Sequence, residues 1–475
     1  MLFPTFGFFY FFAVVIILNW FFLKWPFFWR LFLVIASYYF YFVWDFRFLF
    51  ILVGVSIFNF FSSLAIFRNF FGRKKFFLYL SVIVNLSVLV LFKYYEFFRA
   101  SFESLFFGIG LPINFPLLEI ILPVGLSFYI LRVISYNADV YSGKITEMPL
   151  FLDVLLYVAF FPQLLAGPIM RAPEFLAQLK DGGSKKIDNL WESFTYIILG
   201  LFKKIVISSY LVLNITDDVF SVPQNHSRLV VLLAVFAYSV VIYFDFSAYS
   251  DMSIGFAGLL GFKSPLNFDR PYLSQNLQDF WRRWHITLSS WFRDYVYIPL
   301  GGNKKGPLGK YINLIIVMVL AGLWHGASIN FIIWGLLNGL GLVAVHIYYD
   351  YKKRKNLYKT ENNNLIKKFF CWLTTFIFIS FAWIFFRSNT VGDAFVLIKT
   401  IFNPLKTAEP IQLYVILMTL VGFLFFIFEK QIFQGFKFIQ EKMPIFLTVI
   451  FIIFIVILIF KMSPDTIPSF IYFSF

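Results

Sequence analysis

Stretches of about twenty mostly apolar residues recur along the whole chain, and they constrain its fold more than any other feature. A bilayer core of about 30 Å is crossed by a helix of roughly twenty residues. Of the 475 residues, 60% are hydrophobic and only 14% are charged, whereas soluble domains carry about a quarter charged residues. The sequence therefore predicts an all-α, polytopic integral membrane protein, built as a single domain over residues 1–475.

About eleven transmembrane helices are expected, together with re-entrant or interfacial helices. They fall into N-terminal spans (residues 1–115), a core that carries the sequence motifs (116–345) and C-terminal spans (346–475). The first apolar run lacks both a preceding basic residue and a small-x-small cleavage site, so we expect it to remain as a helix in the membrane. The candidate spans begin near Phe6, Phe28, Phe48, Phe76, Leu117, Phe151, Ser193, Leu229, Tyr311, Lys368, Ile411 and Pro444.

The formal net charge of +15 is concentrated in short basic clusters between apolar runs. Such clusters favour cytoplasmic loops and contact anionic lipid head groups. A nucleic-acid-binding protein would need a soluble basic face, which this sequence lacks. If the first cluster is cytoplasmic, the three spans before it place the N-terminus outside. The clusters are RNFFGRKK (68–75), KDGGSKK (180–186) and YKKRKNLYK (351–359).

Two segments interrupt the apolar pattern. FFPQLLAGPIMRAPEFLAQL (160–179) contains three prolines and a glycine, and broken backbone at membrane depth is tolerated only inside protein or beside a wet cavity. FWRRWHITLSSWFRDYVYIPLGGN (280–303) is too polar to span, and its helical spacing predicts one amphipathic interfacial helix with His285 at the edge of an aromatic stripe. A surface helix whose histidine merely caps this stripe is an equally good interpretation. The stripe comprises Trp281, Trp284, Leu288, Trp291 and Tyr295, and Arg282, Arg283, Arg293 and Asp294 lie opposite.

His325 lies inside the apolar stretch AGLWHGASINFIIWGLLNG (321–339), which we interpret as part of a membrane span. No Asp, Glu, Lys or Arg occurs between Lys310 and His346. Ionisable side chains in spans are costly and usually face a bundle interior or a water-filled path. Gly322 and Gly326 form a G-x-x-x-G pair that lets a neighbouring helix approach closely. His325 is therefore expected to face a crowded interior, where it either has a chemical function or only hydrogen-bonds between helices.

A buried, neutral histidine suits acyl transfer, because it can take a proton from a hydroxyl that attacks a thioester or ester carbonyl. Burial disfavours the charged form and keeps the imidazole basic. The sequence has no Ser–His–Asp signature, no H-E-x-x-H and no glycine-rich phosphate loop. The single cysteine, Cys371, excludes an internal disulfide. No metal is expected, because His226, His285, His325 and His346 lack the spacing of metal ligands.

The chain resembles the membrane-bound O-acyltransferases, specifically the bacterial branch of alginate and peptidoglycan O-acetyltransferase membrane components. The two histidine motifs, forty residues apart, make this resemblance specific, and it runs nearly end to end. It rests on ILPVGLSFYILRVISYNADVYSGK (121–144), FFPQLLAGPIMR (160–171), IYFDFSAYSDMSIGFAGLLGF (242–262), FDRPYLSQNLQDFWRRWHITLSSWFRDYVYIPLGGN (268–303), GLWHGAS (322–328), WIFFRS (383–388) and FIYFSF (470–475).

This resemblance implies a helical bundle around a transmembrane tunnel in the bacterial cytoplasmic (inner) membrane. His325 would be the catalytic residue and His285 the second important histidine. No bound cofactor is implied. Acetyl-CoA, or another acyl thioester, would donate from the cytoplasm. The acetyl group would reach an extracytoplasmic polysaccharide, often through a periplasmic partner of the SGNH-esterase type. The residues expected along the tunnel are Trp324, Arg282, Arg283, Trp291 and Gln163.

The chain departs from many relatives where they have SFYTFQ and it has SFYILR, so Arg132 adds a charge that would alter contact with an acceptor or partner. Transfer of D-alanine to teichoic acid is an alternative, although RDYVYIPLGGN resembles the polysaccharide acetyltransferase branch more closely. A lipid or polysaccharide transporter would need repeat symmetry or charges spread over several spans, and neither is present. A scaffold for an export complex remains the third alternative.

Overall fold

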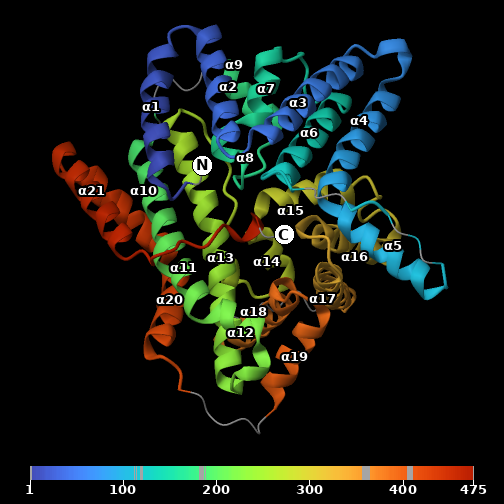
Figure 1. The fold of residues 1–475 in the computed structure, drawn as a ribbon, viewed down its shortest axis with the longest axis vertical. Coiled ribbons are helices and arrows are strands. Elements are labelled where there is room, and N and C mark those ends of the chain that lie inside the picture. Colours follow the sequence, from blue (N-terminus) through green and yellow to red (C-terminus); the bar gives the residue numbers. More distant parts are fainter. Residues whose placement is uncertain are drawn as a thin grey trace. The chain divides into compact units, whose positions relative to one another are not determined.

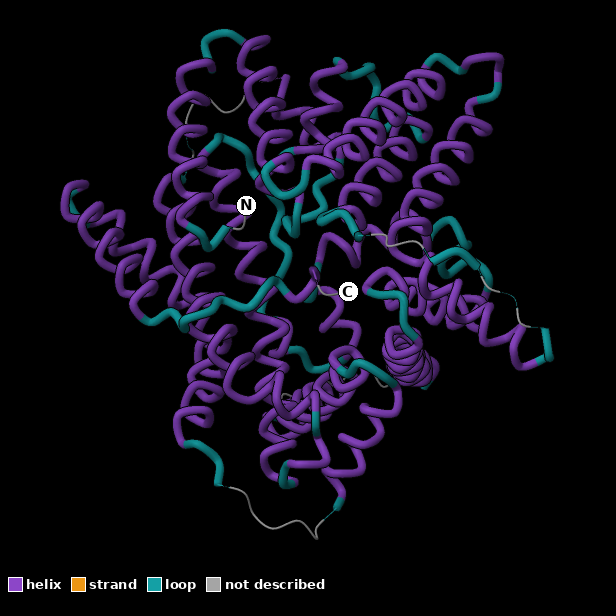
Figure 2. The backbone as a smooth tube through the Cα atoms, viewed as in Figure 1, coloured by secondary structure: helices purple, strands orange, loops and turns teal. Residues whose placement is uncertain are grey.

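The computed structural model describes residues 3–111, 113, 115–117, 121–180, 187, 189–355, 364–403 and 410–473. Within these ranges the chain forms helices joined by loops, without any strand (Figure 2). The all-α prediction is therefore confirmed. Parts of two predicted basic loops, residues 181–186 and 356–359, lie outside the described residues.

Eight helices in the described part of the chain are long and apolar enough to cross a membrane, and three apolar helices of 17 residues accompany them. Their number agrees with the eleven spans that the sequence predicts, but two positions differ. The candidate span near Phe151 is the nine-residue helix Phe151–Ala159, which is too short to cross a membrane, and Ile329–Arg354 is a long apolar helix that was not predicted as a separate span. The eight longer helices are Phe46–Phe67, Lys74–Gly108, Leu190–Ser221, Arg228–Leu259, Gly306–His325, Ile329–Arg354, Leu365–Arg387 and Leu413–Lys442; the shorter ones are Phe6–Phe22, Pro26–Phe42 and Ile445–Lys461.

The chain forms two compact units. The first comprises Met1–Ser193 and Ser253–Pro265, and the second comprises Phe194–Met252 and Leu266–Phe475. Organisation as one integral domain stays a prediction. The first unit contains α1 (Phe6–Phe22), α2 (Pro26–Phe42), α3 (Phe46–Phe67), α4 (Lys74–Leu89), α5 (Tyr95–Gly108), α6 (Leu126–Tyr141), α7 (Phe151–Ala159), α8 (Phe161–Leu164) and α9 (Ala172–Lys180) (Figure 1).

The proline-rich segment of the first unit is broken, as its sequence predicts. Helix α7 ends at Ala159, before the short α8, and α9 begins only at Ala172. The helix expected near Leu117 instead begins at Leu126, because Gly125 precedes it in a left-handed conformation (φ 77°). A Cβ atom on Gly125 would lie 2.5 Å from the carbonyl oxygen of Leu164, so this close approach requires glycine.

The second unit carries both histidine motifs. Helices α10 and α13 contribute residues to both units. The unit contains a core of buried aromatic and aliphatic side chains, to which α10 and α13 also contribute. Its helices are α10 (Leu190–Leu201), α11 (Ser209–Leu211), α12 (Asp217–Ser221), α13 (Arg228–Leu259), α14 (Leu277–Arg283), α15 (Ile286–Phe292), α16 (Gly306–His325), α17 (Ile329–Arg354), α18 (Leu365–Arg387), α19 (Val391–Phe402), α20 (Leu413–Lys442) and α21 (Ile445–Lys461).

The prediction of one amphipathic helix over residues 280–303 is wrong. Helix α14 ends at Arg283, and α15 begins at Ile286. The loop before α14 takes over hydrogen bonds that a continuous helix would make: the carbonyl oxygen of Asn267 accepts from the N–H of Ile286 at 2.8 Å, and the N–H of Asp269 donates to the carbonyl oxygen of Arg283 at 3.0 Å. His285 stands between the two helices.

The interpretation of residues 321–339 as part of one span is also wrong. Helix α16 ends at His325, and Gly326 is extended (φ −166°, ψ 155°). Helix α17 starts after Ser328, whose hydroxyl accepts from the N–H of Asn330. His325 is consequently the last residue of a helix, where the backbone turns, and does not lie in the middle of a span.

The close helix approach predicted at Gly322 is confirmed, and the neighbour is α17. A Cβ atom on Gly322 would lie 2.1 Å from the carbonyl oxygen of Phe331, and one on Gly335 would lie 2.4 Å from that of Met318. Gly326 lies beyond α16, where a Cβ atom would lie 2.0 Å from the Phe331 ring. Glycines on both helices thus let α16 and α17 pack backbone to backbone, which fixes the end of α16 and the histidine there.

Candidate active site

His285 is buried in a strained backbone conformation. It is 1% exposed, and its φ of 40° and ψ of 57° lie in the left-handed region. Few side chains adopt this region, and such strain persists only where surrounding contacts enforce it. Asn267 supplies those contacts, since its side-chain oxygen lies 3.0 Å from His285 Nδ1 and 2.8 Å from the hydroxyl of Thr287.

The hydrogen bonds of Asn267 define the tautomer of His285. The backbone N–H of Thr287 also points at the side-chain oxygen of Asn267, at 3.4 Å. A backbone N–H can only donate, so the atom facing these groups is the oxygen of the carboxamide. His285 Nδ1 must therefore carry the hydrogen, which leaves Nε2 as the acceptor. His285 lies outside the helices that can span a membrane, and its burial lowers its pKa from 6.5 to about 3.

Aromatic rings surround His325, which is 3% exposed. The ring centroids of Trp324, Trp334, Phe386 and Tyr472 lie 4.9, 5.2, 5.1 and 5.4 Å from its own. Helices α16, α17 and α18 supply the first three. The Trp324 ring also lies 6.0 Å from that of His285. The two imidazoles are therefore joined by one indole that contacts both.

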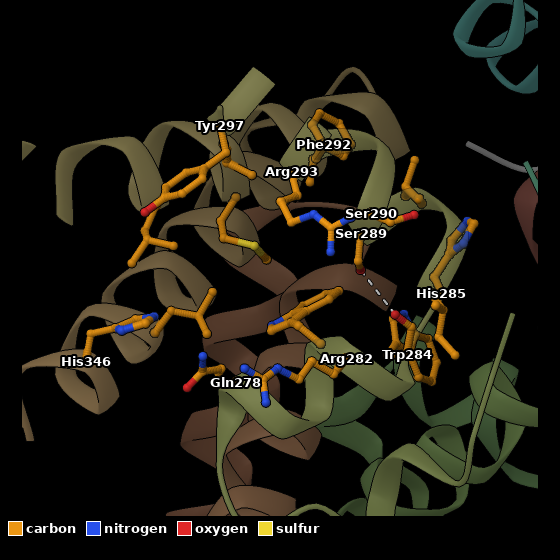
Figure 3. Close-up of a pocket in the computed structure, with 18 of the residues that line it drawn as sticks. Gln278, Arg282, Trp284, His285, Ser289, Ser290, Phe292, Arg293, Tyr297 and His346 are labelled. Atoms are coloured by element: carbon orange, nitrogen blue, oxygen red, sulfur yellow. Dashed lines mark hydrogen bonds between the residues drawn. The ribbon is translucent and has the colours of Figure 1, made fainter. Parts of the chain in front are cut away.

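A cavity of about 430 Å³ reaches both histidines. Its volume is in the range of small-molecule sites. Arg282, Gln278 and the serines of α15 project toward it, and His346 lies at the opposite end from His285 (Figure 3). No sequence motif or spacing groups His346 with the other two histidines. The remaining lining residues are Trp281, Trp284, Ile286, Leu288, Phe292, Arg293, Tyr297, Asn303, Leu314, Val317, Met318, Ala321, His325 and Leu342.

Of the five residues expected along a tunnel, only Arg282 lines this cavity. Trp324 does not line the cavity; its ring contacts the imidazoles of His285 and His325. Arg283 is ion-paired with Asp279 at 3.0 Å, and Trp291 is buried on α15. Their expected tunnel roles stay predictions.

Gln163 belongs to the first unit. Its amide donates to the hydroxyl of Ser264 at 2.8 Å, and its oxygen lies 3.4 Å from the guanidinium of Arg132. Arg132, the residue that departs from the family motif, is 1% exposed and stacks 4.6 Å from the Tyr157 ring. In this conformation Arg132 packs inside the first unit.

Tyr472 is a site residue that the sequence analysis did not single out. Its ring lies 5.4 Å from that of His325 and 4.5 Å from that of Phe246. It belongs to the short 3₁₀ helix η9 (Ile471–Phe473), which follows α21 along the chain. The aromatic motif FIYFSF was the only available signal, and neither helical nor strand spacing connects it to His325.

The second unit thus defines a class of protein: a multi-pass, helical membrane protein with two buried imidazoles at a mostly apolar cavity that also contains several polar side chains. Among the described residues, no three His, Cys, Asp or Glu side chains gather in a way that could hold a metal ion. The sequence pattern of the membrane-bound O-acyltransferases matches residues 142–388, a range that contains both histidines. The chain belongs to the membrane-bound O-acyltransferase family.

The names of similar proteins agree with this assignment. The peptidoglycan O-acetyltransferase of Helicobacter pylori is 38% identical over 373 residues, which cover 73% of this chain and 68% of the relative. A probable alginate O-acetylase of Pseudomonas aeruginosa is 36% identical over 354 residues, covering 74% and 65%. The teichoic acid D-alanyltransferase of Bacillus subtilis is 27% identical over 280 residues, covering 56% and 69%. The matches therefore span about two thirds of each relative's length.

Proposed function

We propose that the chain is an O-acetyltransferase that supplies acetyl groups to an extracytoplasmic polysaccharide. The observation that carries the proposal is the position of His325: a buried imidazole at a helix end, on the wall of a cavity that could hold a small substrate. The similarity to O-acetyltransferases of peptidoglycan and alginate supports the acetyl group and the polysaccharide acceptor.

In the proposed reaction, His325 acts as the general base. Its imidazole takes the proton of an acceptor hydroxyl while the hydroxyl oxygen attacks the carbonyl carbon of the acetyl thioester. The tetrahedral intermediate then collapses, the carbon–sulfur bond breaks, and the departing thiolate recovers the proton from the imidazolium. The aromatic rings around His325 exclude water from this step, which protects the thioester from hydrolysis.

We assign His285 a different role. A histidine whose pKa is lowered to about 3 stays neutral at physiological pH and cannot serve as a proton donor. Its Nε2 atom is held as an acceptor by the bond from Nδ1–H to Asn267. His285 therefore orients a hydroxyl or thiol by accepting its hydrogen bond, and His325 carries the proton.

The donor in this proposal is acetyl-CoA, which enters from the cytoplasm. Arg282 and Arg293 line the cavity and add positive charge that suits the donor's phosphates. We place the protein in the bacterial cytoplasmic membrane with its N-terminus outside. A periplasmic protein of the SGNH-esterase type completes the transfer to the glycan.

The test is transfer of radiolabelled acetyl groups from acetyl-CoA in membranes that contain the protein, its partner and the glycan. His325→Ala is expected to reduce the rate by roughly 100- to 10,000-fold, the usual contribution of a general base. His226→Ala is the matched control, because His226 is also buried in the second unit but does not line the cavity. Normal transfer by a correctly inserted His325→Ala protein would contradict the proposal.

D-Alanyl transfer is the second candidate, favoured by the match to teichoic acid D-alanyltransferases. The same membranes distinguish the two reactions. If a D-alanyl thioester is used and acetyl-CoA is not, the proposed acetyl donor is wrong while the role of His325 stands.

A further inference from the structure

Two adjacent lysines are buried in the second unit, and each has its own carboxylate partners. Lys203 and Lys204 lie on η3 (Phe202–Ser208), a π-helical turn that follows α10, and both are 1% exposed. Lys203 pairs with Asp251 at 2.6 Å and with Glu429. Lys204 pairs with Asp245 of α13, which is 2% exposed. Buried charges persist only when they are paired and hydrogen-bonded, so both pairs are integral to the fold.

Only the second pair contacts the segment of residues 463–473. The backbone N–H of Ile471 donates to Asp245 Oδ2 at 2.7 Å. Lys204 Nζ donates to the carbonyl oxygen of Ser469 at 3.3 Å. The two charges therefore bind two backbone groups of this segment, two residues apart, and define which residues lie beside α13.

This anchoring places an aromatic side chain at the candidate active site. Between the two anchored residues, Phe470 is fully buried, with its ring 4.3 Å from that of Tyr249. The next residue after Ile471 is Tyr472, whose ring stacks on that of Phe470 at 5.4 Å and lies 5.4 Å from that of His325. Figure 1 shows the chain running from α21 to the centre of the second unit, beside α13 and α14.

We propose that Lys204 and Asp245 are positioning residues for acyl transfer, acting as a charged latch that holds segment 463–473 so that Tyr472 closes one side of the His325 site. The latch rests on the proposed function of His325. It acts through the backbone of the segment, and neither Lys204 nor Asp245 lines the cavity.

Burial strengthens these hydrogen bonds, because the protein interior has a low dielectric. Charge-assisted hydrogen bonds to backbone groups are roughly twice as strong as neutral ones. Removing Lys204 leaves Asp245 as an uncompensated buried charge, which would draw water to the latch and release the segment. Release would open one aromatic wall of His325 and leave the cavity lining unchanged. The maximal rate should therefore fall while the KM for the donor stays the same.

The experiment uses the full chain with Cys371→Ser and a reporter, Phe470→Cys, in the buried part of the segment. Labelling of the reporter by a membrane-permeant maleimide measures release, and acetyl transfer is measured separately without the reporter. Lys204→Met is expected to raise the labelling rate by about tenfold or more, and to lower kcat with KM unchanged. Lys203→Met is the matched control, since it also breaks a buried ion pair on the same turn without contacting the segment.

A double variant guards against simple misfolding. Lys204→Met with Asp245→Asn has no unpaired buried charge, and the asparagine oxygen can still accept the N–H of Ile471. Its labelling rate and kcat should return toward those of the reference protein. Equal effects of Lys203→Met and Lys204→Met, or no effect of Lys204→Met on labelling, would overturn the latch. If Lys204→Met raises the labelling rate of the reporter but the His325→Ala protein stays fully active, the proposed function is overturned and the latch is still supported.

Discussion

At the scale of a single residue, the burial of His285 makes the stability of the protein depend on pH. Asn267 holds Nδ1–H, and burial lowers the pKa of the imidazole to about 3, from 6.5 in an exposed histidine. Between about pH 6.5 and 3, the His285 imidazole is protonated in the unfolded chain but stays neutral in the folded protein. Stability should therefore fall as the pH decreases from about 6.5 toward 3, by at most about 1.4 kcal/mol for each pH unit, with no contribution above this range.

Thermal unfolding in detergent at several pH values tests this expectation. The His285→Gln variant, which has no imidazole to protonate, should lose less stability than the wild type between about pH 6.5 and 4. The difference between the two curves isolates His285 from the other titrating groups. Parallel curves over this interval would mean that His285 is protonated in the folded protein, and its assignment as a neutral acceptor would fall.

At the scale of the element, the packing of α16 against α17 determines where His325 lies. A Cβ atom on Gly322 would meet the Phe331 carbonyl oxygen at 2.1 Å, and backbone cannot rotate away as a side chain can. Gly322→Ala should force the helices apart, cost about 1–3 kcal/mol, and reduce acetyl transfer because His325 follows three residues later. Gly435→Ala is the control, because nothing lies within 4 Å of its Cβ position on α20.

Thermal midpoints and transfer rates of the two variants give the comparison. Gly435→Ala should be neutral or stabilise by about 0.5–1 kcal/mol, since alanine has the better helix propensity. If Gly322→Ala matches Gly435→Ala in stability and activity, the close approach of α16 and α17 does not set the position of the histidine.

The same two helices show what the sequence could predict. Apolar length identified most of the spans, and the glycine pattern identified a close contact at Gly322, because both depend on residues near each other in the chain. The break at Gly326 was not predicted, since an apolar run continues across it. The break at His285 was hidden by a regular helical pattern, and it exists because Asn267, eighteen positions earlier, binds the turn.

The other site residues that the sequence analysis did not predict are brought together by the fold, and their spacing in the sequence does not indicate this. Tyr472 contacts His325 although the two are 147 positions apart in the sequence, and His346, on α17, lines the same cavity. Nothing in periodicity or spacing pairs such positions. The Lys204 pair is similar, because a buried lysine in a π-helical turn resembles an interfacial anchor until its partners on α13 and in segment 463–473 are known.

At the scale of the whole molecule, the number of crossings determines which loops share a side of the membrane. Three apolar helices, α1 to α3, lie between Thr5 and Phe71. An odd number of crossings puts these two residues on opposite sides. The basic residues around Phe71 favour the cytoplasm, so Thr5 should face the outside. Phe71 is 88% exposed in the loop after α3, and Thr5 is half-buried at the start of α1.

Single cysteines at these two positions, in a Cys371→Ser background, test the orientation. A membrane-impermeant maleimide applied to intact cells should label Thr5→Cys, whereas Phe71→Cys should react only after the membrane is opened. The two proteins differ only in the position of the reporter, so each is the control for the other. Labelling of Phe71→Cys alone would invert the proposed orientation, because the basic loop would then face outward. Labelling of both in intact cells would mean an even number of crossings, so that one of α1 to α3 does not span.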